Sequence, residues 1–236
     1  MIEKRFNELY SRSYEKNIKC FTDFLNIDEQ SILEGTYLVC VKHGGYPLAE
    51  RVIAGFGDGI EEADFPIALL KIAPVNQKFA DKLTHRDFLG ALMNLGIKRE
   101  LLGDIIVSEN TGYLFCIEQI KAYIIDNLRT LKHTTVSVNE IEQLPDTAVK
   151  EPEIKQVIVS SLRLDALISA VYKLSRSQSS KLFLQDKIFV NSKLISNNSY
   201  QLKDSDIISV RGFGRIYYVS QIKTTKKNRI VVEIKI

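Results

Sequence analysis

The alternation of apolar and polar residues predicts three successive segments, each of which combines helices with strands. In the first segment, apolar spacing predicts a helix at about 2–17, and Asp28 is a good N-cap for a second helix that ends near Leu33. Three apolar runs predict strands, the first of them buried: 37–43, 51–56 and 65–74. This pattern predicts an N-terminal α/β domain of the α+β class over residues 1–74.

The second segment, residues 75–150, has the order helix, hairpin, helix, strand. Thr84 is the expected cap of a helix that extends to about Leu95. The other elements follow as strands at 104–109 and 112–118, a helix at about 119–128 and a strand near 134–138. This order is compatible with a ferredoxin-like layer, the frame of RNA-recognition domains, so we predict an RRM-like RNA-binding domain here.

In the third segment, residues 157–236, two short helices precede a series of short strands. Ser160 or Ser161 is the expected N-cap of the first helix, and Ser175 followed by Gln178 forms a capping box that starts the second. The predicted strands are 187–190, 207–210, 216–222 and 230–236. The chain as a whole is therefore expected to be α+β and multi-domain, with a helix pair and a small β-sheet at its end.

Composition narrows the class of protein. Hydrophobic residues make up 45% of the chain, no run of eighteen apolar residues occurs, and the first residues lack the apolar core of a signal peptide. We therefore expect a cytoplasmic protein that makes no membrane contact. The polar stretch 147–156 contains Pro152 and is expected to be a linker. Cys20, Cys40 and Cys116 have no spacing typical of a zinc site or a disulfide framework, and we expect no metal and no cofactor.

Charge is distributed unevenly along the chain. Residues 157–236 hold 14 Lys and Arg and 5 Asp and Glu, a net charge of +9, whereas residues 1–156 have a net charge of −6. Basic charge that gathers beside a helix pair is typical of a nucleic-acid contact. A charge run alone is usually a solvated face, and the nucleic-acid interpretation is favoured here because the basic cluster coincides with a stretch that resembles a known RNA-binding family.

The candidate RNA-binding residues are polar or cationic and lie in or beside the helix pair and the turns that follow it: Arg163, Arg176, Ser177, Lys181, Lys187, Asn191, Lys193, Arg211, Arg215, Lys226 and Lys227. Arginine forks suit phosphate oxygens, and the glycines of the stretch 211–215 would let the backbone approach a phosphate closely. The alternative for that stretch is a glycine β-bulge with solvated arginines. We favour RNA contact, in part because this stretch also resembles a known RNA-binding family.

A second set of cations lies in the middle segment. Arg86 belongs to a His-Arg-Asp triplet that resembles the kinase catalytic loop, but the other kinase motifs are missing. Asp87 is expected either to cap its helix or to form a local salt bridge. Together with Arg86, the nearby Lys98 and Arg99 are the candidates for a secondary RNA-binding patch.

The stretch from Ser160 to Asn191 resembles an S4-type RNA-binding domain. The resemblance rests on Arg163-Leu164-Asp165, on Ser175-Arg176-Ser177 and on the strand "KIFVN", and it continues in "LKDSDIISV" at 202–210. The family usually has glycine where this chain has Asp186. Three further stretches resemble the YlmH group of bacterial S4-domain proteins: "GGYPLAER" at 44–51, 83–107 and the tail 208–229.

The resemblance implies a non-catalytic protein that binds structured RNA. Its implied partners are ribosomal RNA of the large subunit and tRNA, in the rescue or quality control of stalled peptidyl-tRNA, with no small-molecule substrate. Two alternatives stay open: an RNA-modification enzyme or accessory, similar to the pseudouridine synthases, and a cell-division interaction protein. In the enzyme alternative Asp165 would be a catalytic candidate, but we expect it to have a structural role, either as a cap or in a pair with Arg163 or Lys173. The oligomeric state is not predicted.

Overall fold

The computed structural model describes residues 2–149 and 151–236, so Lys150 of the expected linker lies outside the described residues. The chain divides into two compact units, which are described separately below. One unit contains Met1–Glu29 and Tyr37–Lys150, and the other contains Gln30–Thr36 and Glu151–Ile236.

The first segment forms a three-stranded antiparallel sheet with strand order β1-β3-β2. Its elements are α1 (Ile2–Lys16), β1 (Cys20–Phe21), α2 (Ile27–Gly35), β2 (Val41–His43) and β3 (Ile53–Phe56). The two predicted helices are confirmed, but the cap of α2 is Asn26. Its side-chain oxygen accepts hydrogen bonds from the backbone N–H groups of Asp28 and Glu29 at 2.9 and 3.1 Å.

The strand expected at 37–43 is shorter than predicted and is not buried. Only Val41–His43 form β2, while the side chains of Tyr37 and Val39 are 89% and 71% exposed. β2 is an edge strand that pairs only with β3 on its inner side. The apolar composition of the run therefore reflects an exposed surface, and β3 is the strand that is buried throughout.

The second segment forms a five-stranded antiparallel sheet with strand order β5-β6-β4-β8-β7. Its elements are β4 (Ile67–Pro74), α3 (His85–Asn94), β5 (Leu102–Ser108), β6 (Thr111–Ile117), α4 (Lys121–Asn127), β7 (Thr130–Leu131) and β8 (Thr134–Glu140). Short 3-10 turns lie at Glu62–Asp64, Gln77–Phe79, Arg99–Leu101, Glu118–Ile120 and Asp146–Ala148. The helix capped by Thr84, the hairpin and the last strand are confirmed, and the hairpin turns at Glu109 and Asn110.

The strand β4 corrects the expected boundary near residue 74. The run 65–74 does form a strand, but it pairs with β6 and β8 at the centre of the second sheet. With β4 included, the order of elements is strand, helix, strand, strand, helix, strand, which is the ferredoxin-like order. The division into three segments stays a prediction, with β4 moved to the middle one.

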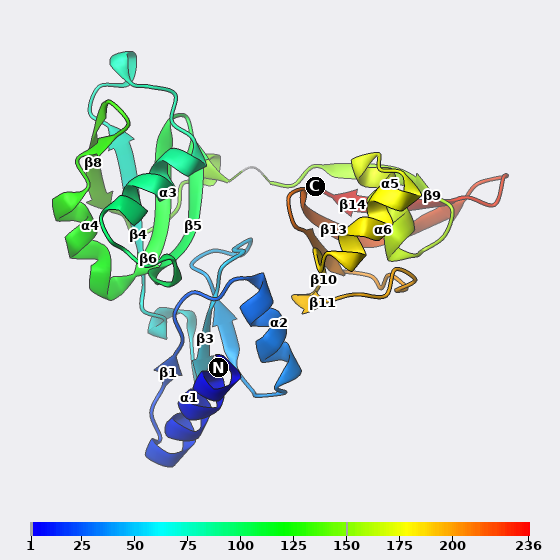
Figure 1. Ribbon diagram of the computed structural model, residues 1–236, viewed down its shortest axis with the longest axis horizontal. Coiled ribbons are helices and arrows are strands. Elements are labelled where there is room, and N and C mark those ends of the chain that lie inside the picture. Colours follow the sequence, from blue (N-terminus) through cyan, green and yellow to red (C-terminus); the bar gives the residue numbers. More distant parts are fainter. Residues whose placement is uncertain (1, 150) are drawn as a thin grey trace. The chain divides into compact units, whose positions relative to one another are not determined.

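The two faces of this sheet are covered differently. α3 and α4 lie on one face (Figure 1), where Phe88, Leu92 and Ile124 pack with Leu70 and Leu114 of the strands. On the opposite face, Phe115 of β6 packs in a cluster that includes Phe24 and Ile53 of the first segment. Both faces of the ferredoxin-like sheet are therefore buried against other parts of the same unit.

The last part of the chain forms a six-stranded antiparallel sheet with strand order β11-β10-β12-β13-β14-β9. Its elements are β9 (Ile154–Val159), α5 (Leu164–Tyr172), α6 (Arg176–Leu184), β10 (Ile188–Val190), β11 (Lys193–Leu194), β12 (Ile207–Val210), β13 (Gly214–Thr224) and β14 (Ile230–Lys235). Leu164, Leu167 and Ile168 of α5 pack on the sheet in one apolar core. The four predicted strands and both helices are confirmed.

Two boundaries in this part differ from the prediction. The N-cap of α5 is Arg163 because residues before it are held extended: Arg163 bridges to Gln201, and the carbonyl of Leu162 accepts a hydrogen bond from the Leu202 N–H at 2.9 Å. The expected linker ends earlier than 156, since β9 begins at Ile154 and pairs along its whole length with β14. Both differences arise from pairing with residues far away in the sequence.

Asp186 ends α6 in a conformation that favours glycine. Its φ is 52°, and the N–H groups of Asp186 and Lys187 donate to the carbonyls of Phe183 and Leu182 at 3.2 and 3.1 Å, which is a Schellman motif. A carboxylate at a helix C-terminus also meets the negative end of the helix dipole. We expect Asp186→Gly to raise the free energy of unfolding by about 1 kcal/mol.

Urea unfolding of the full chain measures this effect in the transition of the C-terminal unit. Asp204→Gly is the matched control, because Asp204 is also an exposed turn residue but is not among the residues with positive φ. The control should lose about 0.5–1 kcal/mol. An Asp186→Gly variant no more stable than the wild type would contradict this account of the helix end.

Within residues 2–149 and 151–236, no helix is long and apolar enough to cross a membrane. The same residues contain no group of three or more His, Cys, Asp or Glu side chains arranged to hold a metal ion. Cys20 and Cys116 are buried, Cys40 is half-buried, and all three are free thiols. Burial raises the pKa of Cys116 to about 12, so this thiol stays protonated.

Candidate nucleic-acid interface

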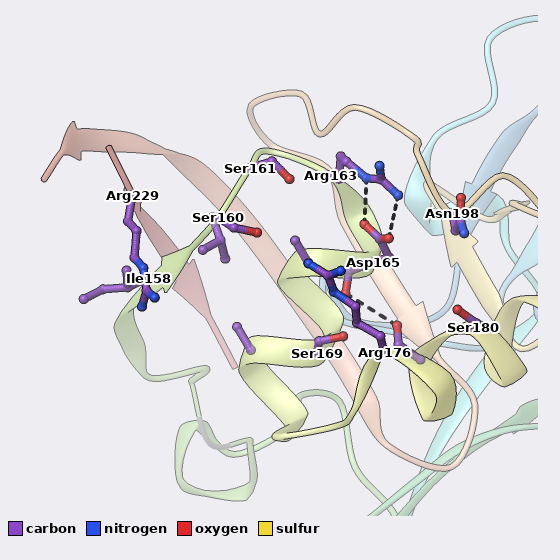
Figure 2. A pocket seen from close by; sticks show the side chains of 14 residues that line it. Ile158, Ser160, Ser161, Arg163, Asp165, Ser169, Arg176, Ser180, Asn198 and Arg229 are labelled. Carbon is purple, nitrogen blue, oxygen red and sulfur yellow. Dashed lines mark hydrogen bonds and ion pairs between the residues drawn. The ribbon is translucent and has the colours of Figure 1, made fainter. Parts of the chain in front are cut away.

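A hollow of about 610 Å³ lies over the N-terminal ends of α5 and α6 (Figure 2). Its walls come from the end of β9, from α5 and α6, from the loop that contains Asn198 and from the residue that precedes β14. Three arginines, Arg163, Arg176 and Arg229, line it together with the polar side chains of Ser160, Ser161, Ser169, Ser180 and Asn198. Asp165 is the one acidic residue in this lining. The hollow therefore has the donors and the positive charge that a phosphate group requires.

Arg163 is held in place by its neighbour on the helix. Its Nε and Nη2 atoms donate to the two carboxylate oxygens of Asp165 at 3.0 and 2.7 Å (Figure 2). These hydrogen bonds raise the pKa of Arg163 further. The expected pairing of Asp165 with Arg163 is confirmed, so the Asp165 carboxylate has a positioning role. Nη1 of Arg163 takes no part in this pair and can donate to a ligand.

Arg176 lies at the first position of α6, directly after the predicted cap. The capping box is confirmed: the Ser175 N–H donates to Gln178 Oε1 at 2.9 Å, and the Gln178 N–H donates to Ser175 Oγ at 3.3 Å. Ser179 is buried and donates to the Asp165 carbonyl at 3.5 Å, which brings α6 close to α5. This close packing places the exposed Arg176 side chain beside the first turn of α5.

Arg229 is a lining residue that the sequence did not single out. The β13–β14 turn closes on it, since its carbonyl accepts a hydrogen bond from the Thr225 N–H at 2.7 Å and its N–H donates to Thr225 Oγ1 at 3.0 Å. The next residue, Ile230, pairs with Val159 at the end of β9. Among the described residues, neither Arg176 nor Arg229 forms an ion pair, so both guanidinium groups are available to an anion.

A second group of predicted residues lies at the turn between β12 and β13. The guanidinium of Arg211 lies over the ring of Phe189, 5.3 Å from its centroid, and the Arg211 N–H donates to the Lys187 carbonyl at 2.9 Å. Phe213 packs on Tyr172 at the end of α5, with ring centroids 5.0 Å apart. This turn therefore contacts the C-terminal end of α5, and none of the residues 211–213 is among those that line the hollow.

The remaining predicted residues of this unit have several roles. Lys226 and Lys227 are exposed at the tip of the turn that ends at Arg229. Lys181 is exposed on α6, and Lys193 is exposed on β11. The side chains of three other predicted residues are partly buried or form hydrogen bonds within the domain. Arg215 is half-buried in β13, and the Ser177 hydroxyl lies 3.0 Å from Ser175 Oγ. Asn191 donates to Asp206 and accepts from the Ile207 N–H, both at 2.9 Å, so its amide stabilises the β10–β11 turn.

The predicted secondary patch does not form as one group. Arg99 directs its Nη1 into the fold, where it donates to the carbonyls of Leu102 and Gly103 at 2.6 and 3.0 Å. Burial lowers the pKa of Arg99 to about 10. Lys98 is exposed and lies 3.8 Å from Glu100. Arg86, in contrast, lines a separate hollow next to α3.

The stretch 44–51, which carries part of the YlmH resemblance, has a structural role in this unit. Asp104 of β5 accepts hydrogen bonds from the Tyr46 hydroxyl at 2.9 Å and from the N–H groups of Glu50 and Arg51 at 2.6 and 3.1 Å. The Tyr46 ring stacks on Phe115 with centroids 5.1 Å apart. The stretch is therefore clamped onto the face of the ferredoxin-like sheet that α3 and α4 do not cover, which we call the open face.

Arg51 completes this clamp from the side of the first segment. Its guanidinium donates to the carbonyls of Leu102 and Phe24, both at 2.8 Å. Burial lowers the pKa of Arg51, and the charges of Glu29 and Asp104 oppose that shift. We name this set the Asp104 clamp; it consists of Asp104, Tyr46, Glu50 and Arg51.

Comparisons with known proteins agree with the resemblance seen in the sequence. A family model described as "Putative RNA-binding domain in YlmH" matches residues 61–144, which contain the ferredoxin-like sheet. The ribosome-associated protein quality control protein P2 of Bacillus subtilis (strain 168) is 34% identical over 220 residues, which cover 88% of this chain and 83% of that protein. The solved structure of the cell division protein ylmH from Streptococcus pneumoniae is 30% identical and covers 60% of this chain and 89% of that one, with a TM-score of 0.49.

Proposed function

This chain belongs to the YlmH family, and from this premise we propose that it is a non-catalytic protein that binds structured RNA through an S4-type C-terminal domain. The observation that carries the proposal is the hollow lined by Arg163, Arg176 and Arg229. Three guanidinium groups from three different elements surround a space large enough for a phosphate and its neighbouring sugars. Such a group recognises the backbone of RNA through charge-assisted hydrogen bonds.

The hollow favours backbone recognition over base recognition. The grooves of A-form RNA expose phosphates and 2′-hydroxyls, while the base edges of the major groove are out of reach of side chains. Serine hydroxyls and the amide of Asn198 beside the arginines can accept or donate hydrogen bonds to a 2′-hydroxyl. We therefore infer that the domain reads the shape and backbone path of a folded RNA.

We further infer that the RNA is ribosomal RNA of the large subunit together with tRNA, at ribosomes that carry stalled peptidyl-tRNA. The support is the relative from Bacillus subtilis, whose name describes a ribosome-associated quality control protein. A protein in this role would be located in the cytoplasm, because ribosomes translate there.

Sucrose-gradient sedimentation of cell extracts tests this role. The protein should move with the large-subunit fraction, and more of it should do so when translation is stalled by an antibiotic. Treatment with RNase should release it. If it stays at the top of the gradient under both conditions, the ribosomal role is wrong. If RNase-resistant association with other proteins is found instead, the cell-division alternative gains support over RNA binding.

A further inference from the structure

The stretch 44–51 covers the open face of the ferredoxin-like sheet, the face without α3 and α4. Domains of the RNA-recognition type stack bases on aromatic side chains of that face. Here Tyr113 and Phe115 of β6 are 8% and 2% exposed, and Phe115 is covered by the stacked ring of Tyr46. Gly45 approaches Phe115 so closely that an added Cβ would lie 2.3 Å from the ring. The stretch held by the Asp104 clamp therefore keeps bases away from these rings.

The helical side of the same domain offers a polar hollow instead. It has a volume of about 510 Å³ and lies between α3 and the stretch from the end of α4 to β7. Its cationic lining residues are Arg86, Arg129 and Lys132, its amides are Asn94 and Asn127, and Asp87 is its acidic residue. The lining therefore has a net charge of +2, although residues 1–156 have a net charge of −6.

The charges in this hollow are arranged in two different ways. Lys132 Nζ lies 2.8 Å from Asp87 Oδ2. This bond is the largest cause that lowers the pKa of Asp87 to about 2, so the pair persists at neutral pH and is lost only as the pH falls through that range. Arg86 and Arg129 are exposed, and neither forms an ion pair with a described residue. Lys132 thus occupies the carboxylate of Asp87. The guanidinium groups of Arg86 and Arg129 are left for an external anion.

We propose that the ferredoxin-like domain binds RNA backbone in this hollow, through Arg86 and Arg129, and not on the open face of its sheet. The planar guanidinium groups of these two arginines can each donate two hydrogen bonds to one of two adjacent phosphates. The amides of Asn94 and Asn127 also line the hollow; Asn127 Nδ2 donates to the Tyr123 carbonyl at 2.8 Å, which leaves its Oδ1 to accept from a ribose hydroxyl. The proposal rests on the proposed RNA-binding function and gives the domain a second site, separate from the hollow at α5 and α6.

The test measures binding of the full chain to purified large-subunit ribosomal RNA over a range of salt concentrations. In Arg86→Glu/Arg129→Glu, two phosphate contacts are lost, so the slope of log affinity against log salt should become less steep by about 1.4–1.8. Affinity at low salt should fall about 10-fold or more. Arg86→Lys/Arg129→Lys should retain most of the slope, because the charges remain.

The matched control is Lys71→Glu/Lys78→Glu, which makes the same change of charge in the same domain. Lys71 is an exposed residue of β4 next to the buried Leu70 and Ile72 of the helical side, so it lies on the opposite face of the sheet. Lys78 is exposed in the 3-10 turn Gln77–Phe79 and is not among the residues that line the hollow. The control should lose less than about 3-fold in affinity and keep its slope. An equal loss in the control would overturn the proposal.

Two further outcomes separate this proposal from the function on which it rests. If Arg86→Glu/Arg129→Glu has no effect while Arg176→Glu/Arg229→Glu weakens binding, the second site is wrong and the C-terminal site stands. If neither variant weakens binding, both are wrong. If the Arg86/Arg129 variant loses ribosome association but binds purified RNA normally, the hollow contacts an acidic protein surface, which also overturns the proposal.

Discussion

The double variant Arg176→Glu/Arg229→Glu should lose about 100-fold or more in affinity for structured RNA. Both side chains line the hollow at the N-terminal ends of α5 and α6, and neither forms an ion pair with another described residue. A hydrogen bond to a charged group contributes about 1.5–3 kcal/mol, so the loss of two such contacts corresponds to about 3 kcal/mol or more. Reversal of charge adds repulsion of the phosphates.

Filter binding or fluorescence anisotropy at one salt concentration measures this loss. Lys203→Glu/Lys235→Glu is the matched control, because it changes the charge of the same unit equally at two exposed residues that do not line the hollow. The control should lose less than about 5-fold through long-range electrostatics. Equal losses in the two variants would show that net charge, and not the hollow, determines affinity. Circular dichroism verifies that both variants are folded.

Asp104→Ala should lower the free energy of unfolding of the first unit by about 3 kcal/mol. The carboxylate accepts three hydrogen bonds, from the Tyr46 hydroxyl and from two backbone N–H groups of the stretch 44–51. Its removal takes away these three hydrogen bonds and a negative charge next to Arg51 and Arg99, whose pKa values burial already lowers.

Thermal and urea unfolding of the full chain measure this change. Asp126→Ala is the control, since Asp126 is an exposed residue of α4 in the same unit, and its loss should change the free energy of unfolding by less than about 0.5 kcal/mol. Asp104→Asn keeps one acceptor oxygen and should fall between the two. A loss below about 1 kcal/mol for Asp104→Ala would mean that the clamp does not hold the first segment on the sheet.

Local patterns in the sequence predicted much of the secondary structure. The capping box from Ser175 to Gln178, the hairpin before Gly112 and the pair of Arg163 with Asp165 all follow from residues close together in the chain. The spacing of apolar residues also predicted the helices and most strands. These features depend on hydrogen bonds and packing within a few residues, so a short window contains the information.

Contacts between distant residues could not be predicted in the same way. β4 joins the second sheet because it pairs with β6 and β8, and Arg229 reaches the hollow because Ile230 pairs with Val159. Neither register is visible in one sequence. Arg86 and Arg99 were grouped because they are near in the chain, but Arg99 donates to backbone carbonyls whereas Arg86 lines a hollow.

The motif at 44–51 shows a related limit. Its glycines and its arginine could equally have belonged to a ligand site, and only the contacts with Asp104 and Phe115 reveal that it closes the sheet face. This closure has a functional consequence, because bases cannot stack on the covered face, and the proposed RNA contact of the first unit lies on the helical side.

Crosslinking of the full chain to RNA on large ribosomal subunits, followed by identification of the crosslinked peptides, tests the central claim most directly. The account predicts crosslinks in the peptides that contain Arg163, Arg176 and Arg229, all of which line one hollow. Crosslinks confined to residues 1–149, in a protein that still associates with the subunit, would contradict it.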